Sequence, residues 1–491
     1  MAIRRYNKDH LRQLAPEVTL VRPRELEHKE GDPLVFWTRH ELPQLVDLRV
    51  FADGDDGRSG GRKGRRVARP FTGRPNLIAE LAPALRALWE YAAPRTVAQY
   101  MQALREWWRL FDVVEGDLAD HGVPSQKVRS VKDIGELHRQ RAFDDNMRRG
   151  PFGAVLAAIN IARKAQGLRQ LLWSRPAFRP RARHLPPESQ VREVRIALKH
   201  GWFATLDRWQ TADELLAGRE PTDAEELRLL RNYRMLEAAQ LHAGQPRPRK
   251  DEVLNGRNAS SFYADGFSLS DMFRGRYPDA EDIRYAFYLC LASTGWNPSV
   301  LLTIDANSGF IETHPKDPTR YLLRGYKARS RSEQYSEGLY KSQGSAGVVI
   351  QTLISRTEPL RVQLRKELNR QEFEYQRMLR DGEPAEQLDA QRKVVTKLQI
   401  GVSSPWLYVA TSTDEIVWLD PNLSVYAKGV NGGEGTSFLD GLIGRLNADR
   451  SRDQQIAPMT AGDFRDAFAA YAYRISGGMV LYVMKALGHK S

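Results

Sequence analysis

The chain has 491 residues, 41% hydrophobic and 27% charged, which is typical of a globular protein with two or three domains. Its 74 Lys and Arg against 61 Asp and Glu give a formal net charge of +13, an excess that favours a polyanionic partner such as nucleic acid. The single cysteine, Cys290, excludes an intrachain disulfide and a multi-cysteine zinc site, and it fits a buried thiol in a reducing cytoplasm.

The sequence begins without the apolar segment of a secretory signal, and no stretch is apolar over the length that spans a bilayer. It also lacks the short patterns of P-loop NTPases, serine hydrolases and zincins. We therefore expect a cytoplasmic protein with no membrane partner.

Residues 1–85 form an N-terminal region with a candidate strand at PLVFWT and a basic, Gly- and Arg-rich linker within residues 52–75. Two interpretations of the linker stay open: its cations follow a phosphate backbone, or they are the charges of a solvated loop. The side chains concerned are Arg58, Arg62, Lys63, Arg65, Arg66 and Arg69.

Residues 86–245 predict a helical domain, and the helical pattern already begins near residue 76. Apolar residues recur at helical spacing in NLIAELAPALRALWEYA and in APRTVAQYMQALREWWRLFD, where Thr96 is a candidate N-cap. A later helix opens with Thr222 and Glu225 at the spacing of a capping box.

Residues 246–491 predict helices mixed with a few strands. One apolar helix ends at Gly295, and another begins with Asn297 as N-cap and Pro298 in the first turn. The segment RYLLRGYKARSRSEQYS predicts a β-hairpin with a basic turn, and SPWLYVATSTDEIVWLD predicts a short strand pair after two long helices.

The last segment predicts two helices separated by Gly477 and Gly478. Thr460 and Asp463 have capping-box spacing at the start of the first helix. We expect its buried face to consist of Phe464, Phe468 and Tyr471.

Three segments of this region resemble, in order and spacing, the catalytic domain of the tyrosine recombinases, the phage integrase family. They are STGWNPSVLLTID, LRGYKARSRSEQ, and the final pair TAGDFRDAFAAYA and VMKALGHKS. The earlier segment APRTVAQYMQALREWWRLF resembles the first helix of that family's core-binding domain. The resemblance implies a mainly α fold with a small β component. A helical core-binding domain at 86–245, which clamps DNA, would precede a mixed α+β catalytic domain at 246–491 with an insertion near 345–430.

The resemblance implies a site-specific recombinase or integrase of a mobile element, which cuts and rejoins DNA strands through a 3′-phosphotyrosine. The transition state concentrates negative charge on phosphoryl oxygens, so fixed cations and N–H donors lower the barrier. No metal or nucleotide cofactor is needed, because the phosphotyrosine conserves the bond energy. The implied partners are double-stranded DNA, further copies of the chain on paired DNA sites, and partner recombinases.

The family's catalytic positions transfer to three residues of this sequence. Lys327 matches the hairpin lysine, Arg465 the second arginine and His489 the late histidine. Each also has a structural interpretation, as a turn charge, a surface arginine and a helix-end residue. In addition to the basic residues of the linker, Arg95, Arg329 and Arg331 are expected to contact DNA.

Two family positions are substituted. Asn297 occupies the place of an arginine and Gly462 that of a histidine, so one cation and one donor are missing. Candidate replacements for the missing charge are Arg284, Arg324 and Arg329.

The family's nucleophilic tyrosine follows the late histidine by a short distance, so we expect it beyond Ser491. The preceding Tyr471, Tyr473 and Tyr482 are expected to pack in the core. The alternatives are a catalytically inactive DNA-binding relative that assists a partner recombinase, and a helical scaffold whose basic surface binds RNA or protein.

Overall fold

The computed structural model describes residues 32–40, 44–57, 69–123, 127–177, 186–327, 332–411, 415–419 and 437–486. Helices predominate among these residues, and their strands form small antiparallel sheets, which confirms a mainly α chain with a small β component. Within the same ranges, no helix has both the length and the apolar character needed to cross a membrane.

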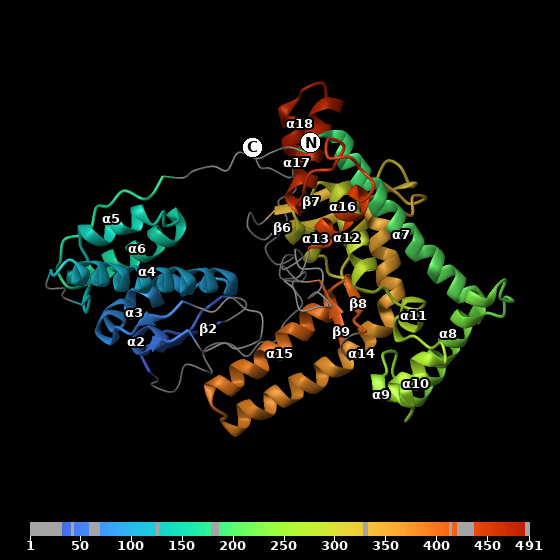
Figure 1. Cartoon of the computed structure of the whole chain (residues 1–491), viewed down its shortest axis with the longest axis horizontal. Helices are drawn as coiled ribbons and strands as arrows, with labels where there is room; N and C mark the ends of the chain where they lie inside the picture. Colours follow the sequence, from blue (N-terminus) through green and yellow to red (C-terminus); the bar gives the residue numbers. More distant parts are fainter. Residues whose placement is uncertain are drawn as a thin grey trace. The chain divides into compact units, whose positions relative to one another are not determined.

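The chain divides into two compact units, Met1–Ala182 and Arg183–Ser491 (Figure 1). This division differs from the expected boundaries after residues 85 and 245. Residues on both sides of position 85, such as Phe36 and Trp107, share one hydrophobic core. The helices between Arg183 and residue 245 belong to the second unit, because their apolar residues pack against later elements of the chain.

The first unit contains short strands and a set of helices around an aromatic core. The hairpin of β1 and β2 places Phe36 opposite Val46, and it confirms the strand expected at PLVFWT. Helix α4 begins at Pro94 after the N-cap Ala93, not after Thr96, because Pro94 already has the backbone geometry of a first helical residue. The elements are β1 (Val35–Trp37), β2 (Leu45–Asp47), α2 (Arg49–Asp53), β3 (Gly54–Asp55), β4 (Phe71–Thr72), α3 (Pro75–Trp89), α4 (Pro94–Asp120), the 3₁₀ turn η2 (Val131–Asp133), α5 (Glu136–Asp144) and α6 (Arg149–Ala165).

A buried ion-paired arginine fixes α3 to α4 in this unit. The Arg74 guanidinium donates to Asp112 and to Glu115, each at 2.6 Å, and to the carbonyl of Val128 at 3.1 Å. It also lies over the Phe111 ring. Because two carboxylates and a carbonyl surround the charge, the cost of burying it is offset locally.

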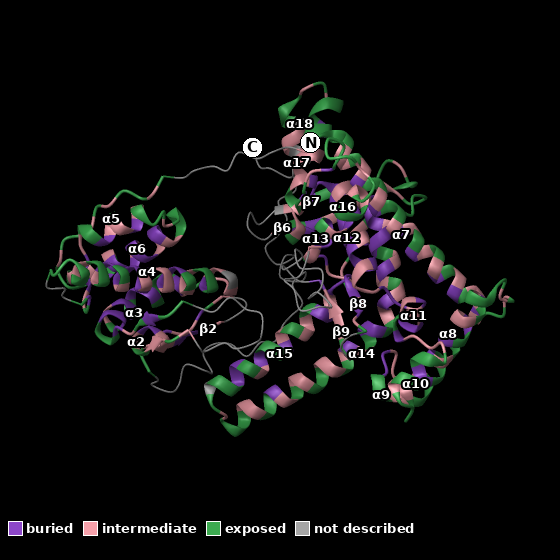
Figure 2. Ribbon diagram, in the orientation of Figure 1, coloured by how far each residue is buried: buried purple, intermediate pink, exposed green. Residues whose placement is uncertain are grey.

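The second unit is built around helix α12, which is buried along most of its length (Figure 2). Helix α7 packs along α12, and α14 and α17 also lie against it. The elements are α7 (Glu188–Leu216), α8 (Ala224–Ala243), α9 (Lys250–Leu254), α10 (Ala259–Ala264), α11 (Leu269–Arg274), α12 (Ala280–Thr294), α13 (Pro298–Leu302), β5 (Ile311–Thr313), β6 (Arg320–Lys327), β7 (Ser332–Leu339), α14 (Ala346–Asp381), α15 (Ala385–Ser403), β8 (Leu407–Val409), β9 (Ile416–Trp418), α16 (Phe438–Asn447), α17 (Ala461–Ile475) and α18 (Val480–Ala486).

The expected β-hairpin and strand pair are both present. Strands β6 and β7 pair antiparallel from Arg320 opposite Leu339 to Lys327 opposite Ser332, and β5 pairs with the other edge of β6. Strands β8 and β9 form the second pair. Strand β6 has the alternating buried and less buried residues that predict a strand, whereas β5 was not expected.

The described residues near 345–419, within the segment expected to be an insertion at 345–430, form part of the second unit's core. Helices α14 and α15 pack side by side, and α14 contributes Val349, Ile350 and Leu353 to the cluster around α12. The fully buried Arg361 of α14 donates to the carbonyls of Val402 and Ser404 at 3.1 and 2.9 Å, which fixes the end of α15.

Helix α8 begins one residue later than a capping box at Thr222 predicts. Asp223 is the N-cap, and its carboxylate accepts from the backbone N–H of Glu226 at 2.8 Å. Asp223 is an equally good cap residue. Glu226, in turn, bonds the Thr222 hydroxyl and Arg219, and chiefly the Arg219 hydrogen bond lowers the pKa of Glu226 to about 2.

The single cysteine is packed inside the second unit, as expected. Cys290 lies on α12 and is fully buried, with Sγ 3.8 Å from the carbonyl of Ala346. Burial raises the pKa of the thiol well above its usual range.

Candidate functional site

The turn between α12 and α13 is the centre of the candidate site. Helix α12 ends at Gly295, which has a left-handed backbone with φ 63°, and α13 begins at Pro298. A Cβ atom at Gly295 would lie 2.3 Å from the ring of Phe468 on α17. Glycine is therefore needed at position 295 for two reasons: the left-handed backbone and the close approach of α17.

Arg465 of α17 contacts this turn directly. Its guanidinium donates to the carbonyl oxygen of Gly295 at 2.8 Å, across 170 positions of sequence. Burial lowers the pKa of Arg465 below its usual value, while the charge of Asp466 opposes that shift. The bond positions a cation two residues from Asn297.

Strand β6 approaches the same turn from another side. A Cβ atom at Gly325 would lie 2.5 Å from Val300 of α13 and 2.6 Å from the Trp296 ring. The Thr303 hydroxyl, just after α13, donates to the carbonyl of Tyr326 at 3.1 Å. The end of β6 is thereby held against α13.

Lys327 is the last residue of β6 and is half-buried. Side chains two apart on a strand share a face, so Lys327 continues the face of Tyr321, Leu323 and Gly325. This face packs toward the α12–α13 turn. The structure thus brings the segments that carry Lys327, Asn297 and Arg465 together in one region of the second unit.

The two substituted positions lie in the same region. Asn297 is the N-cap residue of α13, as expected, but its side chain makes no capping hydrogen bond. Gly462 is the second residue of α17, and a Cβ atom there would meet only the Thr460 hydroxyl, at 3.6 Å. A side chain therefore fits at position 462. The capping box of Thr460 and Asp463 is present as predicted, with the Asp463 carboxylate accepting from the Thr460 N–H at 2.7 Å.

Two of the three arginines considered as replacements for the missing charge, Arg284 and Arg324, are engaged elsewhere. Arg284 is buried, donates to the carbonyl of Ala280 at 2.7 Å and lies over the Tyr408 ring. Arg324 is ion-paired with Glu312. Both side chains have structural contacts that the sequence pattern does not reveal.

Several predicted site residues lie outside the described residues or have side chains that do. Arg95 is in α4, but its side chain is not described. The others outside the described ranges are His489, Arg329, Arg331, Arg58, Arg62, Lys63, Arg65 and Arg66.

The tyrosines expected in the core are exposed where the structure describes them. Tyr471 is 48% exposed and Tyr473 is 50% exposed, whereas Phe464 on the same helix is buried. The expectation for Tyr471 and Tyr473 was wrong because α17 buries a narrower stripe than its aromatic content suggests. The side chain of Tyr482 in α18 lies outside the described residues.

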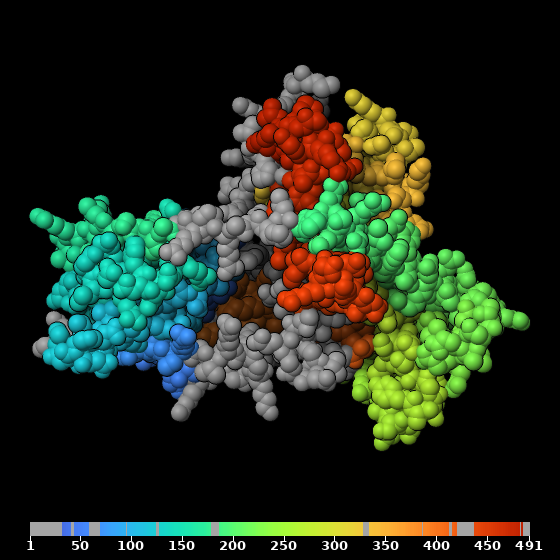
Figure 3. All heavy atoms as spheres, turned by 45° about the horizontal axis from the view of Figure 1, so that its top comes forward, coloured from blue at the N-terminus to red at the C-terminus, as the bar shows by residue number. Residues whose placement is uncertain are grey.

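An exposed ion pair connects the end of α17 to the start of α7. Arg474 donates to both carboxylate oxygens of Glu188, at 2.6 and 2.7 Å. In Figure 3, α17 and α18 accordingly lie beside the first turns of α7. Both side chains of this pair are largely exposed, so the pair adds little to the stability of α17.

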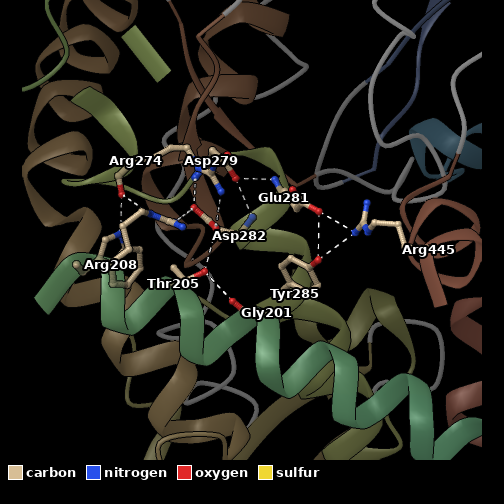
Figure 4. Close-up of polar contacts among 10 residues, drawn as sticks. Gly201, Thr205, Arg208, Arg274, Asp279, Glu281, Asp282, Tyr285 and Arg445 are labelled. Atoms are coloured by element: carbon tan, nitrogen blue, oxygen red, sulfur yellow. Dashed lines mark hydrogen bonds and ion pairs between the residues drawn. The ribbon is translucent and has the colours of Figure 1, made fainter. Parts of the chain in front are cut away.

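The opposite end of α12 carries a charged network that the sequence analysis missed (Figure 4). Asp282, 2% exposed, accepts from Arg208 at 2.5 Å and from the Thr205 hydroxyl at 2.9 Å. Asp279 caps the helix and pairs with Arg274 at 2.8 Å. Burial and the neighbouring Asp282 raise the pKa of Asp279.

A second contact at this end links α12 to α16. Arg445 donates to Glu281 at 2.8 Å and to the Tyr285 hydroxyl at 3.0 Å (Figure 4). In the sequence, Asp279 and Asp282 stand three positions apart in DAED, a spacing that indicates a capped helix start. Their arginine partners come from α7 and from the end of α11, which local spacing does not indicate.

Comparison with known proteins gives no relative: no family model, no curated protein and no solved structure matches the chain. Among the described residues, no group of three or more His, Cys, Asp or Glu side chains is placed to hold a metal ion.

Proposed function

We propose that the chain is a DNA-binding protein of the tyrosine-recombinase type, and that it binds a DNA phosphodiester where the α12–α13 turn, the end of β6 and the start of α17 meet. The observation that carries the proposal is the hydrogen bond from Arg465 to the carbonyl of Gly295. It positions a guanidinium beside the segment that carries Asn297, while β6 presents Lys327 on the adjoining face.

In this proposal the reaction is a phosphoryl transfer without hydrolysis. A tyrosine oxygen attacks the phosphorus, the bond from phosphorus to the 5′ oxygen breaks, and the 3′ phosphate stays on the tyrosine. Lys327 protonates the departing 5′ oxygen, and Arg465 stabilises the charge on the phosphoryl oxygens. His489 supplies a further donor. The DNA partner belongs to a mobile element, and copies of the chain or partner recombinases assemble on paired sites.

The test uses the whole protein and a nicked duplex that traps the covalent intermediate. We expect Lys327→Ala and Arg465→Ala to abolish the SDS-resistant protein–DNA band while duplex affinity stays within about threefold, since phosphate contacts elsewhere supply most affinity. Arg474→Ala is the matched control, because it removes a cation from the same helix without touching the turn. If either site variant forms the adduct at the parental rate, the assignment of that residue to the site is wrong.

A second candidate function is a catalytically inactive DNA-binding relative that assists a partner recombinase. The observations that favour it are the neutral Asn297 and the bare Gly462, together with the engagement of Arg284 and Arg324 elsewhere. Adduct from the parent would exclude it.

The double variant Asn297→Arg/Gly462→His sharpens this choice, because position 462 has room for a side chain. Faster adduct formation would show that the missing cation and donor limit an active enzyme. No adduct from the parent or the double variant, with duplex binding intact, would establish the inactive relative.

A further inference from the structure

The first unit carries a cluster of arginines that the candidate site does not use. Arg105 and Arg109 are one helical turn apart on α4, and the backbone of Arg69 lies beside them just before β4. The charges of Arg105 and Arg69 both act on Arg109 and lower its pKa, although burial is the largest cause. Three like charges therefore lie close together on one surface.

Aromatic rings contact the guanidiniums of Arg105 and Arg109, and a carbonyl also accepts from that of Arg109. Arg105 lies over Phe51 at 5.9 Å and Arg109 lies over Phe71 at 6.0 Å. The two rings are themselves stacked, with centroids 5.7 Å apart. The Nε of Arg109 also donates to the Arg69 carbonyl at 2.9 Å. Stacking on a ring fixes a guanidinium while leaving its edge able to bond.

The described carboxylates offset the charge of the cluster only in part. Among the described residues, Arg69, Arg105 and Arg109 form no ion pair, although other arginines of this unit do, as with Arg74. Glu106 acts on Arg109 from a distance but bonds Arg148 at 2.8 Å. Asp55 also raises the pKa of Arg109 without pairing with it. Like charges four residues apart on a helix, such as those of Arg105 and Arg109, lower the stability of the helix. A bound anion would relieve this repulsion.

We propose that Arg69, Arg105 and Arg109 form a second phosphate-binding site, through which the first unit binds the backbone of nucleic acid. Guanidinium edges match phosphate oxygens in pairs, and the underlying rings fix them before the ligand arrives. The inference rests on the proposed function for the identity of the ligand as duplex DNA. The arrangement of the three arginines by itself indicates only that the ligand carries phosphate groups.

The main experiment measures binding of the full chain to a fluorescent 30-base-pair duplex over a range of KCl concentrations. Arg105→Gln/Arg109→Gln should lower affinity about tenfold at low salt and reduce the slope of log K against log salt by about two. The matched control is Arg139→Gln/Arg141→Gln, which removes two charges from the same unit at arginines that are ion-paired. It should leave the slope unchanged. Equal effects in both double variants would overturn the proposal.

Two further measurements distinguish loss of the binding site from loss of the fold. Arg105→Lys/Arg109→Lys retains charge but loses the fork, and it should recover only part of the affinity. Urea unfolding of each variant identifies any that fails to fold, and the Lys pair then carries the test: parental affinity in it would count against the proposal.

Pyrophosphate separates failure of this site from failure of the proposed function. If the parent binds no duplex but is thermally stabilised by pyrophosphate, and Arg105→Gln/Arg109→Gln removes that stabilisation, the cluster is a phosphate site and the DNA function is wrong. If pyrophosphate and duplex both bind equally to parent and variant, the cluster is not the site.

Discussion

The two ends of helix α12 differ in how their polar groups are used. At the start, Asp279 and Asp282 are matched by Arg274, Arg208 and a hydroxyl. At the end, Asn297 makes no capping bond, and the buried indole N–H of Trp296 has no partner among the described residues. Fully paired charges stabilise a fold, whereas incompletely used groups in a crowded turn are typical of a functional site.

The largest effect on stability is expected at the start of α12. Asp282→Ala leaves the Arg208 guanidinium without its buried partner, so the free energy of unfolding should fall by about 3–5 kcal/mol. Urea denaturation followed by circular dichroism measures this. Glu188→Ala, which breaks the exposed pair with Arg474, should cost less than about 1 kcal/mol. Similar losses in both would show that burial does not distinguish the pairs.

A smaller loss is expected at the end of α12. Gly295→Ala places a methyl group against Phe468 and forces a left-handed backbone, so the free energy of unfolding should fall by about 2–3 kcal/mol. Gly462→Ala is the control, since its site is open and helical, and it should be neutral or stabilise by less than about 1 kcal/mol. A stable Gly295→Ala variant would contradict the close approach of α17.

Arg465 should contribute more to the proposed reaction than to stability. Arg465→Met removes one hydrogen bond to a carbonyl and should lower the free energy of unfolding by only about 1 kcal/mol. The same urea titration measures it. A loss as large as that of Asp282→Ala would make Arg465 a structural residue, and the two ends of α12 would then be alike.

The smallest effect concerns pH. The pKa of Asp279 is raised in the folded protein, so the folded state binds this proton more tightly than the unfolded state does. This group therefore favours folding most at low pH, and its contribution falls as pH rises above 3.8. Asp279→Asn keeps a good cap residue and should remove that decline. Urea denaturation from pH 4 to 7 tests this, and parallel profiles for parent and variant would contradict it.

Local patterns predicted what depends on neighbouring residues. The helix end at Gly295, the capping box at Thr460 and the β6–β7 hairpin all follow from residue types a few positions apart. The resemblance indicated that the segments of Lys327 and Arg465 belong together, and the structure does bring those segments together.

What the sequence did not reveal depends on distant partners. Nothing near Arg284 or Arg324 indicates that Tyr408 and Glu312 will engage them. The unit boundary at Ala182 also follows from packing, because α7 is amphipathic whichever unit it joins. Exposure of Tyr471 depends on how much of α17 its neighbours cover, which helical periodicity alone does not specify.

The buried Cys290 makes the chain a convenient scaffold for labelling. It is the sole cysteine in the sequence, it has no exposed surface, and burial keeps its thiol protonated. A maleimide probe should therefore not react with the parent protein, and it should label only a newly introduced, exposed cysteine. A dye at position 462, where the backbone has room for a side chain, would then report on the α17 end of the turn alone.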